Sequence, residues 1–160
     1  MSNSQNSGNR PAFNKSNPSA NGQKFIPIPS NARHYVHHDA MSADKLFLYA
    51  LIIDYFNVDT GVAWPSVERL AVDYGKSSKT TGLHIRDLIT AGLIVRPKTG
   101  KYVPLEPLSP DDFYAANPSA LKRMLGLRET AKKRSEEGLE RLEQFRRERD
   151  TRVNDDHTHT

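Results

Sequence analysis

The sequence predicts a mainly α-helical fold with one small β-hairpin, followed by a C-terminal helical extension. Two short helical patterns meet at Gly75, an extended pattern with a turn at Gly100 follows them, and a charged, helix-forming run fills the chain after Ser109. With 160 residues, of which 36% are hydrophobic, the chain can build one modest domain with additional tails.

The N-terminal region divides into two segments. Ser and Asn occupy 11 of the first 22 positions, and such a composition cannot offset the entropy cost of ordering, so we predict a disordered tail over residues 1–24. Pro27 and Pro29 exclude a helix around them. Residues 25–41 are therefore predicted to be an extended arm whose apolar residues pack on the domain that follows.

Three histidines of this arm, His34, His37 and His38, have the i, i+3, i+4 spacing that brings imidazoles together on a helix. A metal site is the alternative to surface or capping histidines, but no Cys or fixed acidic ligand nearby completes the set. We therefore expect no metal and no other cofactor.

Residues 42–108 are predicted to be the folded domain. Its first helix begins at an N-cap, Ser42, and ends at the turn-forming run 57–61. The apolar residues that recur at helical spacing are Leu46, Phe47, Ala50, Leu51, Ile53 and Phe56.

The next two helices are predicted to form a helix-turn-helix. Pro65 is favoured at a helix start, Gly75 supplies the left-handed turn residue, Ser77 caps the second helix and Gly92 closes it. The residues expected to face the core are Leu70, Ala71, Thr81, Ile85, Leu88 and Ile89.

After Gly92 the apolar period changes from helical to extended. Residues 93–97 and 101–105 are predicted strands joined by a turn, which makes a β-hairpin. A helix, a helix-turn-helix and a hairpin in this order are the winged helix-turn-helix arrangement. The hairpin carries the cations Arg96, Lys98 and Lys101 beside a tyrosine, a composition that suits a wing along a phosphate backbone.

The charge distribution agrees with a DNA-binding surface. Residues 42–75 hold two basic and five acidic side chains, a net charge of −3, whereas residues 76–101 hold six basic side chains and one acidic one, a net charge of +5. One contiguous half of the domain is therefore electropositive and attracts phosphates.

Residues 42–95 resemble the helix-turn-helix domain of many phage and plasmid replication proteins and mobile-element regulators. The resemblance rests on Asp54-Tyr55-Phe56-Asn57, Gly61-Val62-Ala63-Trp64-Pro65-Ser66, Leu70-Ala71, Gly75 and Ala91-Gly92-Leu93-Ile94. It covers about a third of the chain. It implies double-stranded DNA as the partner and site-specific control of transcription, or origin binding, on a bacterial mobile element.

By the same resemblance, the exposed face of the recognition helix comprises Ser78, Lys79, Gly82, Leu83 and Arg86. Lys79 and Arg86 are the candidates for base-edge or phosphate contacts, because either can bond guanine or an anionic oxygen. The other candidates are Ser77 and Thr80, as phosphate ligands or helix caps, and Lys76, for which a solvated position is the stronger interpretation.

Residues 109–150 are predicted to be charged helices, and residues 151–160 a disordered tail. A sparse heptad-like stripe in the helices could form a homodimer through residues 118–149, but a solvated helix that packs only locally is equally consistent with it. The stripe comprises Leu121, Met124, Leu125, Ala131, Leu139, Leu142 and Phe145.

Several classes of function are disfavoured. The chain has no Cys, no apolar run long enough for a membrane span and no signal-peptide pattern, so we expect a cytoplasmic, nucleoid-associated protein. Lys101 follows Gly100 as in a phosphate-binding loop, but Val95 and Tyr102 break that motif, and an enzyme is not expected. The remaining alternatives are a replication accessory protein, with a host replication or transcription protein as partner, and a protein-interaction module without DNA specificity.

Overall fold

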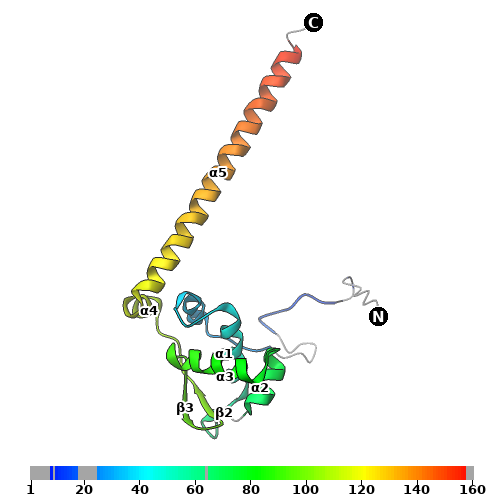
Figure 1. Cartoon of the computed structure of the whole chain (residues 1–160). Helices are drawn as coiled ribbons and strands as arrows, with labels where there is room; N and C mark the ends of the chain where they lie inside the picture. The colour runs from blue at the N-terminus through cyan, green and yellow to red at the C-terminus, as the bar shows by residue number, and fades with distance from the viewer. Residues whose placement is uncertain (1–7, 9, 18–24, 64, 158–160) are drawn as a thin grey trace.

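The structure, a computed structural model, describes residues 8, 10–17, 25–63 and 65–157. Its elements follow the predicted order, with helices α1 to α3, a small antiparallel sheet and two C-terminal helices (Figure 1). The predicted fold class is therefore confirmed. The disordered tail predicted for residues 1–24 falls largely outside the described residues, as do residues 158–160.

Helix α1 (Ala43–Tyr55) is the centre of the domain, because its apolar residues occupy nearly every side and are covered by the other elements. Leu48, Tyr49 and Ile52 are buried although the sequence pattern did not single them out, whereas Phe47, one of the apolar residues at helical spacing, is 45% exposed. Ser42 stands at the N-cap as predicted, but its hydroxyl donates to the Asp44 carboxylate.

The helix-turn-helix comprises α2 (Val67–Tyr74) and α3 (Ser78–Thr90), and both helices pack on α1. The predicted hairpin is confirmed as β3 (Ile94–Lys98) and β4 (Lys101–Pro104).

A second short hairpin, β1 (Phe56–Asn57) with β2 (Val62–Ala63), extends the sheet to the order β1-β2-β4-β3. Its two strands flank the predicted turn, which residues 58–61 form. The Asn57 side chain accepts hydrogen bonds from the backbone N–H groups of Asp59 and Thr60, and Gly61 takes a φ of 70°. Ala63 opposite Tyr102 links the two hairpins.

The prediction of an extended arm over residues 25–41 is wrong for its middle, where η2 (Ser30–His37) is a 3₁₀ helix. The two prolines restrict only the residues around them, and the helix starts directly after Pro29. It is held by tertiary contacts, because the backbone N–H of Leu108 donates to the Tyr35 hydroxyl at 3.0 Å and the Tyr35 ring lies 4.4 Å from that of Phe113.

The arm histidines have protein partners. The Nδ1 of His34 lies 2.9 Å from the Tyr114 hydroxyl, and the Nδ1 of His38 accepts from the Ala40 N–H at 3.0 Å. Burial, with smaller contributions from His34 and Arg123, lowers the pKa of His37. Within the described residues, no group of three or more His, Asp or Glu side chains is arranged to hold a metal.

The C-terminal region begins with α4 (Pro110–Ala116), whose N-cap hydroxyl on Ser109 accepts from the Asp112 N–H at 3.3 Å. Helix α5 (Pro118–His157) has 40 residues, a length of about 60 Å, and projects from the domain (Figure 1). Only its first turns, with Ala120, Leu121 and Met124, pack on the core. The tail predicted from residue 151 is helical up to His157.

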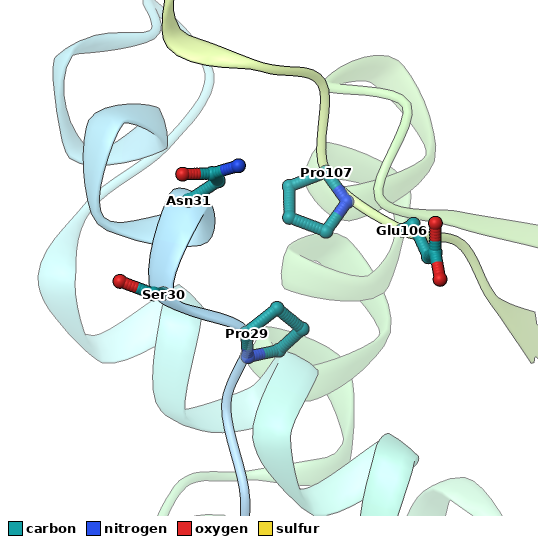
Figure 2. A pocket seen from close by; sticks show the side chains of 5 residues that line it. All are labelled: Pro29, Ser30, Asn31, Glu106 and Pro107. Atoms are coloured by element: carbon teal, nitrogen blue, oxygen red, sulfur yellow. The ribbon is translucent and has the colours of Figure 1, made fainter.

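A hollow of about 260 Å³ lies where η2 begins, lined by Pro29, Ser30 and Asn31 on one side and by Glu106 and Pro107 on the other (Figure 2). Its single ionisable lining residue is acidic, so this hollow does not belong to the electropositive half of the domain. Among the described helices, none has the length and apolarity needed to cross a bilayer.

Candidate DNA-binding surface

The turn between α2 and α3 is built by local sequence signals. The Ser66 hydroxyl accepts from the Arg69 N–H at 3.1 Å, so Ser66 is the N-cap and Pro65, predicted as the first helical residue, lies one residue before it. At the other end, Gly75 has a φ of 71° and its N–H donates to the Ala71 carbonyl at 2.8 Å. A left-handed residue lets the chain leave α2 and enter α3 within three residues.

Helix α3 begins at Ser77, whose hydroxyl accepts from the Thr80 N–H at 3.1 Å. Thr81 is fully buried and donates its hydroxyl to the Ser77 carbonyl at 2.8 Å, so this polar core residue is satisfied. Ile85 and Leu88 are buried on the same face of the helix, as predicted.

The opposite face of α3 carries the candidate contact residues. Lys79, Leu83 and Arg86 are spaced by four and three residues, which places them along one line of the helix surface, and all three are exposed. Leu83 is 49% exposed. Ser78 and Gly82 lie at the edge of this line, and a Cβ added to Gly82 would meet no atom within 4 Å.

The acidic residue of α3 is kept off this face. The Asp87 carboxylate pairs with the Lys45 ammonium of α1 at 2.9 Å, and Lys45 also donates to the Ala40 carbonyl at 2.8 Å. On the same flank, the Nδ1 of His84 lies 2.8 Å from the Tyr74 hydroxyl. The outward line of α3 therefore presents two cations whose charge the helix's own acid does not offset.

Lys76 is half-exposed and has two partners on the domain. Its ammonium pairs with the Asp44 carboxylate at 3.4 Å and lies 5.4 Å from the centre of the Tyr74 ring. Hydrogen bonds, first from the Ser42 hydroxyl and then from Lys76, lower the pKa of Asp44. Both contacts hold Lys76 against the domain.

The β3–β4 hairpin carries the cations of the wing. Lys98 pairs in register with Lys101 across a turn at Gly100, where φ is 77°. Arg96 and Lys98 are exposed, and Lys101 is half-buried. Tyr102, predicted beside these cations, instead belongs to the core at 2% exposure, and this burial raises its pKa.

Sequence reasoning missed the residues that fix the orientation of α3, which are Lys45 and Tyr74. Their partners on α3 are 42 and 10 residues away, respectively, and neither pairing has a periodic or motif signal. Only the packing of α1 and α2 against α3 brings them together.

A match to one protein family agrees with the helix-turn-helix geometry. Residues 40–94 match the sequence model of a family described as a helix-turn-helix domain. A solved structure described as "Structure of MDR initiator" has 16% sequence identity and a TM-score of 0.42, over 60% of this chain and 88% of that chain. No curated protein has detectable sequence similarity to the chain.

The fold and the family match together define a winged helix-turn-helix, a class of DNA-binding domain. Residues 40–94 are the helix-turn-helix domain of this chain, with α2 and α3 as its two characteristic helices.

Proposed function

We propose that this protein binds a specific site in double-stranded DNA, with α3 in the major groove and the β3–β4 wing on the neighbouring backbone. The observation that carries the proposal is the outward line of α3, where Lys79 and Arg86 are exposed while Asp87 is paired on the other flank. Because α3 packs directly against β3, the wing lies beside the helix that carries Lys79 and Arg86.

Each residue of this surface has a role that matches its chemistry. Lys79 and Arg86 donate hydrogen bonds to guanine or phosphate oxygens, and the half-exposed Leu83 contacts a thymine methyl. Arg96 and Lys98 neutralise phosphates without reading sequence. With one apolar and two cationic reading residues, the remaining specificity would come from DNA shape or from a second copy of the protein.

The biological role that we propose is control of transcription, or origin binding, on a plasmid, phage or other bacterial mobile element. We further propose that two copies associate through α5, since two linked domains bind paired half-sites more tightly than one domain binds a single half-site. No catalytic step is part of this proposal.

The test is fluorescence anisotropy on DNA duplexes tiled across the upstream region of the gene and the nearest replication origin, titrated at several salt concentrations. We expect one tile to bind about a thousandfold more tightly than random duplex, and its position distinguishes regulation from origin binding. Uniform binding with a steep salt dependence would contradict site specificity, and no binding would indicate a protein-interaction module.

On the specific tile, Lys79→Ala and Arg86→Ala each weaken binding by about 1–3 kcal/mol if they contact bases. The matched control is Lys122→Ala, which removes an exposed cation from α5, an element outside the helix-turn-helix and the wing. Equal affinities for all of these variants would exclude the outward line of α3 as the reading surface.

A further inference from the structure

The outer part of α5 has an apolar face that the domain does not cover. Leu139, Leu142 and Phe145 follow one another at intervals of three residues and are 64%, 57% and 64% exposed, respectively. Three large apolar side chains on one side of a charged helix are a typical helix-pairing surface.

The charges around this face are arranged in blocks of alternating sign. Residues 128–134 have four basic and one acidic side chains, net +3, and residues 136–143 have one basic and four acidic ones, net −3. Residues 146–152 have four basic and two acidic side chains, net +2. The boundary between the acidic block and the second basic block coincides with Leu142 and Phe145.

We propose that a second copy of this chain covers this face in antiparallel orientation, with the twofold axis beside Gln144. The proposal rests on the dimer of the proposed function and defines its geometry. Reversing the helix about Gln144 places residues 136–143 against residues 145–152 of the partner, so blocks of opposite charge face each other. A parallel, in-register pair would instead place each block against a block of the same sign.

In this orientation the side chains along the seam, the line of contact between the two helices, fit one another. Leu142 packs on the partner's Phe145, and Gly138 leaves room for the aliphatic stem of the partner's Arg149. Arg141 flanks the seam opposite the partner's Glu148. In a parallel pair, Arg141 would face the partner's Arg146.

This arrangement determines how far apart the two DNA-binding domains lie. Pro118 is 26 residues from the twofold axis, about 39 Å of helix, so the two domains occupy opposite ends of a pair about 80 Å long. Because adjacent major grooves on one face of DNA are about 34 Å apart, one dimer does not occupy two half-sites in successive turns.

The first experiment measures the distance between spin labels in the full-length protein. Since the chain has no Cys, Glu129→Cys introduces a unique labelling site. In the antiparallel dimer the two labels lie about 45 Å apart, and in a parallel dimer about 10 Å. A distance near 45 Å supports the proposal, whereas a short distance or a monomer would overturn it.

The second experiment reverses charges and follows dimer dissociation by sedimentation. We expect Arg141→Glu and Glu148→Arg each to raise the dissociation constant about tenfold, and the double variant to restore it, because two flanking pairs change sign together. Tighter association of Arg141→Glu would instead indicate the parallel pair. The control is Lys133→Glu, which reverses the charge of an exposed residue of α5 outside the two facing blocks.

Both measurements are made without DNA, and every substitution that they use lies in α5. A monomeric or parallel result therefore contradicts the antiparallel pair and leaves the DNA-binding proposal to its own titration.

Discussion

Two glycines of the helix-turn-helix have opposite effects on the stability of the fold. Gly75 takes a φ of 71°, which other residues adopt only with strain, whereas Gly82 lies inside α3 with open space around it. The first is required by the turn, and the second costs helix stability.

We therefore expect Gly82→Ala to stabilise the protein by about 1 kcal/mol and Gly75→Ala to destabilise it by at least about 1 kcal/mol. Thermal unfolding measures both, and 1 kcal/mol corresponds to a midpoint shift of about 4–8 °C for a domain of this size. The DNA affinity of Gly82→Ala is a second readout, because the new methyl group extends beside the reading residues. A lower midpoint for Gly82→Ala would show that its backbone environment is not open.

At the scale of elements, the wing is a source of affinity without specificity. Lys98 is exposed at the end of β3, next to the turn of the β3–β4 hairpin. We expect Lys98→Ala to weaken binding to specific and random DNA alike and to lower the slope of log K against log salt by about one. A loss confined to the specific site would instead assign Lys98 to base contacts. The measurement is the anisotropy titration at several salt concentrations.

The start of α5 is tied to the segment after η2 by an ionic contact. The Arg123 guanidinium lies 2.7 Å from the Asp39 carboxylate, and Arg123 also donates to the His37 carbonyl. Hydrogen bonds from Arg123 and then from Ser119 lower the pKa of Asp39 below its ordinary value of 3.8. The contact therefore contributes stability above pH 3.8, and this contribution is lost as the pH falls through the lowered value.

We expect Asp39→Asn to unfold at a slightly lower temperature than the natural protein at pH 6, because this surface contact is exposed and screened. The two midpoints should converge as the pH is lowered below 3.8. Asp54→Asn, which changes an exposed residue of α1, is the control. A difference between Asp39→Asn and the natural protein that persists in acid would show that the carboxylate charge is not what stabilises this junction.

For the whole molecule, α5 combines two structural roles in one helix. Its first turns close the core with Ala120, while residues beyond Met124 extend from the domain. The chain cut after Thr130 should therefore keep its unfolding midpoint within a few degrees and lose self-association. A cut after Asn117 removes the buried turns and should destabilise the domain by several kcal/mol, as deletion of buried apolar side chains does.

Thermal unfolding and sedimentation of both truncated chains check this division. Self-association that survives the cut after Thr130 would place the dimer contact on the domain. A stable chain after the cut at Asn117 would show that α5 is not needed to close the core.

The sequence by itself determined the turns and caps of the fold and the part of the candidate surface that lies on α3. The turn at Gly75, the cap at Ser77 and the hairpin turn at Gly100 were predictable, because left-handed backbone and capping depend on neighbouring residues. The helical period likewise placed Lys79 and Arg86 opposite the buried residues of α3.

Tertiary packing decided the features that depend on residues far apart in the chain. It formed η2 within the arm, with His34 bonded to Tyr114 across 80 residues, and it withdrew Tyr102 from the wing into the core. It also paired Lys45 with Asp87, which leaves the cations of α3 unopposed. Composition and periodicity carry no record of such pairings, because their energy exists only once the elements have packed together.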